Sequence, residues 1–167
     1  AALRDAGFRV PMKAMGVIKN LKIGSAFTFP DGTVITQEEA VDPLRKGRRI
    51  VICGDTTSSR SMEKLAKGAD VIVHEATNTH LKGIDPRDST LRDVTRDTVV
   101  HGHSTPYMAG EFAKRVNAQR LVLNHFSARY KGDASLDSLS IMQRIEYQAM
   151  KASELPASGI AAAWDLM

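Results

Sequence analysis

The sequence has 167 residues, of which 43% are apolar and 25% are charged, and this composition is typical of a globular protein with one buried core. Its formal net charge is +4 at pH 7, which permits an anionic partner such as nucleic acid without requiring one. Aromatic residues make up only 5% of the chain, which argues against a surface built for stacking on bases.

The chain lacks the features of a membrane or secreted protein. No stretch approaches the ~20 consecutive apolar residues that a membrane-spanning helix needs, and the first residues contain no secretory signal. Cys53 is the only cysteine, so no disulfide can form within the chain, and we expect an intracellular, cytoplasmic location. Because the sequence does not start with methionine, we expect it to be a fragment.

The first half of the chain predicts a hairpin followed by a strand and a helix. Two short alternating runs within residues 25–36 flank Pro30-Asp31-Gly32, which is a strong turn signal. After a basic loop, residues 48–55 contain a short apolar run that suits a buried strand. A helix is expected over residues 61–67, with Gly68 ending it.

The second half alternates strands and helices. Residues 69–77 and 119–127 contain the next two buried strands, and a polar loop is expected over residues 78–98. A helix should begin at Thr105-Pro106, where threonine caps the helix and proline takes its first position. A longer helix over Leu136–Lys151 and a strand within residues 159–167 complete an α/β pattern.

Polar side chains stand where the apolar strands end. In α/β sheets such positions are the usual site candidates. Asp55 follows the first core strand and is either a turn residue or a carboxylate ligand. His125 follows a later strand and is either a core histidine or a metal ligand. Glu75 ends the second core strand and is expected to orient a histidine, whereas His74 faces the opposite side and is read as structural, and His80 as solvated.

The segment "HGHSTP" holds two histidines that could share a metal, since residues i and i+2 of an extended chain point the same way. The dinuclear-zinc signature His-x-His-x-Asp-His would require Asp at 105 and His at 106, but the sequence has Thr105 and Pro106. His103 therefore remains a candidate for another chemical role, and His101 is read as a hydrogen-bonded neighbour.

Four blocks, "CGDT", "VIVHEAT", "HST" and "LNHFSARY", occur in this order. Glu75 lies 20 residues after Asp55 (75−55), and His125 lies 22 residues after His103 (125−103). Together with "LKIGSAFTFPDGTVI" and "RKGRRIVICGDT", these blocks resemble the C-terminal half of ribonuclease Z, a member of the metallo-β-lactamase superfamily. The resemblance extends over roughly residues 20–165.

The resemblance implies a fold. We expect an α/β arrangement that is the C-terminal half of a metallo-β-lactamase-type αββα sandwich, with one mixed sheet and flanking helices. Residues 1–167 would form a single partial domain, in which 1–45 are an arm and hairpin region and 46–167 are the half core. One sheet face would be left uncovered, so we expect the missing N-terminal half or a second copy in a homodimer as partner.

The resemblance also implies an activity, the removal of the 3′ trailer from precursor tRNA. In the family, the aspartate corresponding to Asp55 bridges two zinc ions and the histidine corresponding to His125 binds one of them. The counterpart of His103 lies beside the scissile phosphate, where it can protonate the leaving oxygen, and the counterpart of Glu75 holds that imidazole.

Substrate contacts are implied less strongly. Arg129 and Ser127, in "HFSARY", would bind substrate phosphate. Residues 8–24 would correspond to a tRNA-gripping arm, but the chain has Val10-Pro11 where the family has a Gly-Pro motif.

The main departure from the family is the absence of the His-x-His-x-Asp-His ligands. Asp55 and His125 offer two ligands for two zinc ions, whereas a catalytic zinc usually takes ~3 protein ligands. We therefore expect this chain alone to bind zinc weakly or not at all and to be inactive. Any metal would be held by Asp55, His125 and His103, with His101 as a further candidate. The alternatives are another hydrolase of the same fold and a degenerate RNA- or protein-binding module.

Overall fold

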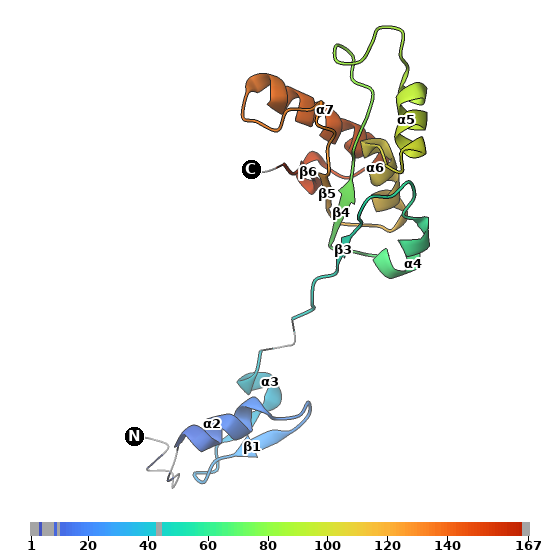
Figure 1. Ribbon diagram of the computed structural model, residues 1–167. Coiled ribbons are helices and arrows are strands. Elements are labelled where there is room, and N and C mark those ends of the chain that lie inside the picture. Colours follow the sequence, from blue (N-terminus) through green and yellow to red (C-terminus); the bar gives the residue numbers. More distant parts are fainter. Residues whose placement is uncertain (1–3, 5–8, 10, 43–44, 165–167) are drawn as a thin grey trace. The chain divides into compact units, whose positions relative to one another are not determined.

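The computed structural model of the chain describes residues 4, 9, 11–42 and 45–164 (Figure 1). The chain forms two compact units, residues 1–47 and residues 48–167. That both belong to one larger domain stays a prediction. Among the described residues, the helices are too short or too polar to cross a lipid bilayer.

The first unit contains the expected hairpin. Helix α2 (Pro11–Lys19) precedes strands β1 (Ala26–Thr28) and β2 (Val34–Thr36), which pair antiparallel, and the short helix α3 (Gln37–Ala40) follows. At the turn, the Asp31 carboxylate accepts the Thr33 N–H at 2.9 Å, and Gly32 takes a φ of +87°, which glycine adopts without strain. The proposed tRNA-gripping stretch thus contains α2, although residues 8 and 10 lie outside the described residues.

The second unit is an α/β layer built on four strands. Strands β3 (Ile50–Ile52), β4 (Val71–Glu75), β5 (Leu121–Asn124) and β6 (Ile160–Ala162) lie in that order, and every neighbouring pair is parallel. The expected α/β layer is therefore confirmed. The expectation of a mixed sheet needs one correction: each connection between these strands passes through helical segments, and such crossovers return the chain in the same direction.

Along the chain, the helices of this unit connect successive strands of the sheet. They are the 3₁₀ turn η1 (Arg60–Met62) with α4 (Glu63–Ala66), α5 (Leu91–Val100), α6 (Pro106–Arg115), α7 (Leu136–Ser153) and the 3₁₀ turn η2 (Ala157–Gly159). The predicted helix starts at residues 106 and 136 are confirmed, with Thr105 and Ser135 as the capping side chains. Gly68 follows α4 with a φ of +70°, as expected of a helix-ending glycine.

Helix α5 corrects the prediction of a loop over residues 78–98. The Thr90 side chain accepts the Asp93 N–H at 3.2 Å, and the Asp93 carboxylate accepts the Thr90 N–H at 3.1 Å. This reciprocal capping box satisfies two N–H groups at the start of the helix. The charged composition of the segment hid this signal, and only residues 78–90 lack helix.

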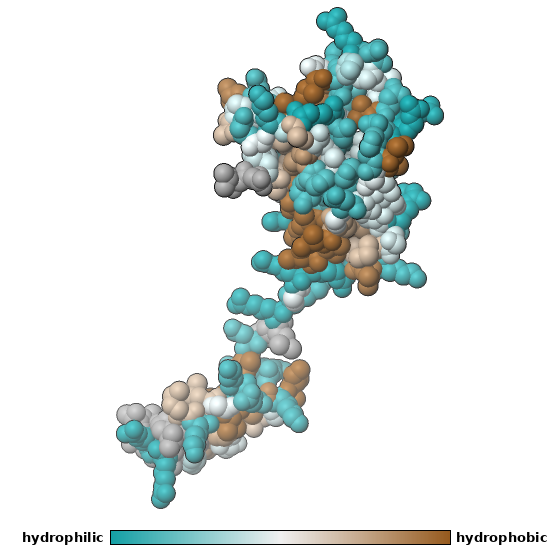
Figure 2. Space-filling view, in the orientation of Figure 1, coloured by the Kyte–Doolittle hydropathy of each residue, from teal (hydrophilic) through white to brown (hydrophobic). Residues whose placement is uncertain are grey.

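Helices pack against one face of the sheet, and the other face has exposed side chains. Helices α6 and α7 pack together and against β4, β5 and β6. The core on this face includes Val51, Ile72, Leu121 and Leu123. On the opposite face of β3, the side chains of Ile50 and Ile52 are 58% and 73% exposed, and Figure 2 shows an apolar patch beside β3 and β4. Within residues 48–164, α6 and α7 therefore cover one face of the sheet, and Ile50 and Ile52 are exposed on the other.

Gly110 allows α6 and α7 to approach closely. A Cβ atom at this position would lie 2.8 Å from the Ala152 Cβ and would also meet the Ala149 carbonyl oxygen. We predict that Gly110→Ala lowers the free energy of unfolding by about 1–3 kcal/mol, because overpacking outweighs the helix propensity of alanine. Glu111→Ala, at an exposed neighbour, should change it by less than ~0.5 kcal/mol in the same urea denaturation. Unchanged stability of Gly110→Ala would contradict the close packing.

Candidate active site

The polar residues singled out in the sequence meet at one edge of the sheet. Asp55 follows β3, Glu75 is the last residue of β4, and His125 follows β5 directly. His103 reaches the same place from the loop between α5 and α6. Single ligand atoms of Asp55, His103 and His125 all lie within 4.8 Å of one another. Because parallel strands bring their carboxyl ends to one edge, three separate segments contribute to a single cluster.

The Glu75 carboxylate is the most buried member of this group, with the residue only 1% exposed. Its Oε1 accepts the backbone N–H groups of Thr56 at 2.9 Å and Ser104 at 3.0 Å. Its Oε2 accepts the Thr77 hydroxyl at 2.5 Å and the Thr77 N–H at 3.3 Å. Burial by itself raises the pKa of this carboxyl, but the hydrogen bonds from Thr77, Thr56 and Ser104 together lower its pKa below the ordinary value.

The His103 imidazole lies against this carboxylate. Its Nδ1 is 3.4 Å from Glu75 Oε1, and its side chain is 25% exposed. Nδ1 itself is buried and has no hydrogen-bond partner. The two groups can therefore form an ion pair when the ring is protonated.

His125 is held in a strained backbone conformation beside His103. Its φ of +55° lies in the left-handed region, which non-glycine residues rarely adopt. The two imidazole centroids are 5.2 Å apart. His125 Nε2 lies 3.6 Å from Asp55 Oδ1, and both side chains are about half exposed. The Ser127 N–H donates to the Thr77 carbonyl at 2.8 Å and ties the segment after β5 to the segment after β4.

Thr77 belongs to this cluster although no sequence motif predicted a role for it. Its hydroxyl oxygen lies 2.7 Å from His125 Nδ1 and 2.5 Å from Glu75 Oε2. The one available signal was its position two residues after Glu75, since alternate residues of an extended segment point to the same side. The histidine it contacts is 48 residues away in the chain.

The other histidines lie outside the cluster. The His74 side chain is buried. Its Nδ1 donates to the Glu75 carbonyl at 2.7 Å, and its Nε2 lies 2.7 Å from the Ser59 hydroxyl. Burial is the main cause that lowers the pKa of His74. The exposed His101 contacts the Asp97 carbonyl at 2.8 Å. Both placements agree with the structural and neighbouring roles read from the sequence.

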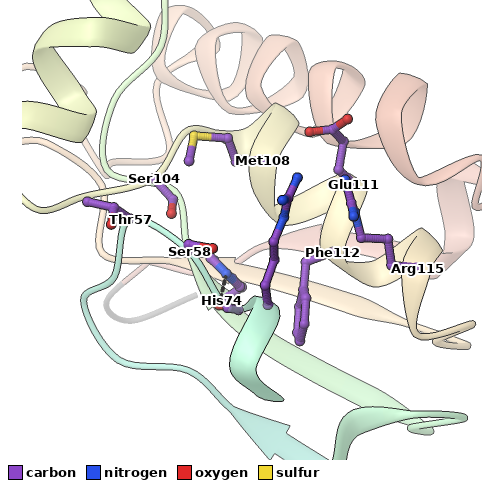
Figure 3. A pocket seen from close by; sticks show the side chains of 10 residues that line it. Thr57, Ser58, His74, Ser104, Met108, Glu111, Phe112 and Arg115 are labelled. Carbon is purple, nitrogen blue, oxygen red and sulfur yellow. Dashed lines mark hydrogen bonds between the residues drawn. The ribbon is translucent and has the colours of Figure 1, made fainter. Parts of the chain in front are cut away.

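A small cavity of about 210 Å³ lies beside the cluster (Figure 3). His74 and Phe112 lie at its base, and Thr57, Ser104 and Arg115 are among the residues that line it. None of Asp55, His103 and His125 lines this cavity. The cavity is therefore distinct from the cluster, although its lining residues Ser104 and His74 are the chain neighbours of His103 and Glu75.

Of the two proposed substrate-binding residues, Arg129 is engaged by partners outside the cluster, whereas the Ser127 N–H bonds to Thr77 within it. The Arg129 guanidinium donates to the Asp85 carboxylate at 2.6 Å and to the Thr79 carbonyl, and it lies over the Tyr130 ring. Ser127 is half-buried, and its backbone joins two loops. Their contact with substrate phosphate stays a prediction.

The donor set suits a zinc ion, since one carboxylate and two imidazoles are ligands that zinc commonly takes. Asp55, His103 and His125 are also the residues expected to hold a metal if this chain bound one alone. His101, the further candidate, is not part of this group. They fit one ion rather than two, because the described part of the chain contains no second group of three such ligands.

The curated proteins that resemble this chain include ribonucleases. No protein-family model matches the chain. Ribonuclease BN of Proteus mirabilis (strain HI4320) is 42% identical over 112 residues, which cover 67% of this chain and 33% of that protein. Ribonuclease Z of Bacillus subtilis (strain 168) is 36% identical over 121 residues, which cover 72% and 36%. The chain thus spans about a third of the length of these curated relatives.

The chain is also similar to solved structures, among them the following two. The short form of human tRNase Z has a TM-score of 0.40 at 40% identity, covering 52% of this chain and 29% of that one. The metallo-β-lactamase-fold protein YhfI of Bacillus subtilis has a TM-score of 0.42 at 18% identity, covering 68% and 36%.

The ion pair between Arg129 and Asp85 should make the stability of the fold depend on pH. Burial raises the pKa of the Asp85 carboxyl, but the hydrogen bonds from Arg129 and Leu81 lower it overall. A lowered folded pKa stabilises the fold above the unfolded pKa of ~3.9, and this stabilisation is lost as the pH falls through the folded pKa. Asp85→Asn should therefore lower the free energy of unfolding by about 1.5–3 kcal/mol at pH 7.

The difference between wild type and Asp85→Asn should shrink below about pH 4. Urea denaturation from pH 7 to pH 3 measures this difference. The exposed Asp88 supplies the control, since Asp88→Asn should change stability by less than ~0.5 kcal/mol. A difference for Asp85→Asn that grows as the pH falls would show that the ion pair does not stabilise the fold.

Proposed function

Because this chain is homologous to part of ribonuclease Z, we propose that it supplies part of the active site of a zinc-dependent endoribonuclease that removes the 3′ trailer from precursor tRNA. The observation that carries the proposal is the cluster of Asp55, His103 and His125, with Glu75 behind His103. A carboxylate, two imidazoles and a buried orienting carboxylate are the groups that such a phosphodiester hydrolysis needs.

Asp55 and His125 are the residues proposed to hold zinc. Zinc, when bound, acts as a Lewis acid that can bring the pKa of water near ~7. Asp55 has two carboxylate oxygens, so it can contact two ions at once, whereas His125 offers a single nitrogen. Both side chains are about half exposed, so a substrate phosphate can reach them from solvent.

His103 is proposed as the general acid. With Nδ1 beside the Glu75 carboxylate, the ring can present a protonated Nε2 to the leaving 3′-oxygen of the RNA. Glu75 fixes the direction of the ring, while its own charge is satisfied by backbone N–H groups. General acid catalysis of this kind typically contributes ~10²–10⁴-fold to the rate.

The rest of the enzyme is proposed to come from sequence beyond this chain. The relatives are about three times as long as the part that matches, and with His103 as the acid only Asp55 and His125 of the cluster remain to hold zinc. The uncovered sheet face, with Ile50 and Ile52 exposed, is proposed to pack against the part of the enzyme that carries the remaining ligands. A homodimer that buries the same face is the other possible outcome. The single cysteine fits a cytoplasmic location.

Zinc titration tests the ligand set. The isolated chain should bind zinc far more weakly than the chain combined with the N-terminal part of a ribonuclease Z, because a catalytic zinc usually takes ~3 protein ligands in addition to water. Asp55→Ala should abolish the second ion and weaken the first in the combined protein, as measured by competition with a chromogenic chelator. Tight stoichiometric binding to the isolated chain, lost on Asp55→Ala, would show that the chain needs no further ligands.

Cleavage of a precursor tRNA tests the activity. The isolated chain should not cleave, and the combined protein should release the 3′ trailer. His103→Ala should slow single-turnover cleavage by ~10²–10⁴-fold because the leaving oxygen loses its proton donor. His101→Ala is the matched control, since this exposed imidazole lies two residues away and outside the cluster. Equal losses in the two variants would contradict the assignment of His103 as the acid.

A further inference from the structure

We infer that Thr77 is a positioning residue, whose hydroxyl connects the Glu75 carboxylate to His125 and fixes the tautomer that leaves His125 Nε2 free to bind metal. The inference rests on the proposed function in one respect, since it takes His125 as a ligand. It assigns a role to a side chain that the sequence motifs left unexplained, and it follows from the direction in which each hydrogen bond must run.

The hydrogen bonds around the Glu75 carboxyl group indicate that it is ionised. Its two oxygens accept two backbone N–H groups, from Thr56 and Ser104, and both the N–H and the hydroxyl of Thr77. Four donors directed at one carboxyl group favour its ionised form, which can only accept hydrogen bonds. The short contact of 2.5 Å between Glu75 Oε2 and the Thr77 hydroxyl is typical of a charge-assisted bond.

The Thr77 hydroxyl donates its hydrogen to Glu75 and accepts one from His125. A hydroxyl carries a single hydrogen, and the carboxylate oxygen cannot donate, so that hydrogen points to Glu75 Oε2. The same oxygen lies 2.7 Å from His125 Nδ1. The only way to form a second hydrogen bond at this distance is for Nδ1 to carry a proton and donate it to the threonine oxygen. A bare Nδ1 would place two lone pairs against each other.

The opposite ring nitrogen of His125, Nε2, is left free to bind a metal ion. In a neutral imidazole with a protonated Nδ1, Nε2 carries the lone pair. His125 Nε2 faces Asp55 Oδ1 at 3.6 Å, within the cluster of candidate ligands. His74 provides the contrast, because both of its nitrogens have hydrogen-bond partners within the fold. Thr77 therefore prepares His125, and not His74, to bind a cation.

Glu75 thus acts on both imidazoles, with one oxygen for each. Oε1 lies against His103 Nδ1, and Oε2 reaches His125 through the Thr77 hydroxyl. Partners of this kind, which orient a ligand without touching the metal, typically change metal affinity by ~10–100-fold. A purely structural role for Thr77 would rest on its backbone, whose N–H contacts Glu75 Oε2 and whose carbonyl accepts the Ser127 N–H.

Two substitutions separate these roles. Thr77→Val keeps the backbone contacts and the shape of the side chain but removes the hydroxyl, and Thr77→Ser restores the hydroxyl. Thr79→Val is the matched control, because it removes another buried hydroxyl from the same segment, one that donates to Gln148. Thermal melts followed by circular dichroism show which variants are folded at the temperature of the measurement.

The test is the tautomer of His125 in the full, metal-free chain, measured by nitrogen-15 NMR of labelled histidine at a pH where the ring is neutral. Wild type, Thr77→Ser and Thr79→Val should show a proton on Nδ1, and Thr77→Val should shift His125 toward the Nε2-protonated form that free histidine favours. A wild-type proton on Nε2, or no change in folded Thr77→Val, would overturn the inference.

Zinc affinity provides the second readout, in the chain combined with the N-terminal part of a ribonuclease Z. Thr77→Val should weaken zinc binding by ~10–100-fold, and Thr77→Ser should stay close to wild type. Equal affinities of Thr77→Val and wild type would overturn the role of Thr77 in metal binding. Absence of zinc binding by the wild-type complex would refute the proposed function instead, while the tautomer measurement still decides the direction of the hydrogen bonds.

Discussion

The arrangement of the site depends on one buried negative charge. Glu75 is 1% exposed, and an ionised carboxylate at such a position is stable only when donors surround it. Those donors come from three separate segments, represented by Thr56, Thr77 and Ser104. Satisfying the charge therefore brings together the segments that carry Asp55 and His103, so the same contacts that stabilise the fold also set the geometry of the cluster.

The similarity to ribonuclease Z inferred from four short blocks is confirmed by relatives that are 36–42% identical over most of the chain. The chain nevertheless covers only about a third of each relative. Its structure fits this coverage in physical terms, since one sheet face is packed by α6 and α7 while the other exposes Ile50 and Ile52. The site lies at the carboxyl ends of β3, β4 and β5.

The sequence predicted the site where local pattern and position carry the information. Apolar runs that end in Asp55, Glu75 and His125 indicated the strands and their ends, and parallel pairing brings such ends together. The role of Thr77 depends on a contact across 48 residues, and the pairing of Arg129 with Asp85 depends on one across 44. No local pattern reveals such contacts. Helix α5 was missed for another reason, because its charged residues masked a capping box that was present in the sequence.

The left-handed backbone at His125, with its φ of +55°, lowers the stability of the fold at a position where the imidazole is proposed to serve the active site. An L-residue with a branched or bulky side chain is disfavoured there by roughly 1–2 kcal/mol, whereas glycine and asparagine adopt the conformation readily. Selection for thermostability alone would accordingly replace this histidine, and libraries screened for heat resistance should enrich glycine or asparagine at residue 125. If histidine were retained at residue 125 under those conditions, the imidazole would be required for a reason other than the stability of this backbone conformation.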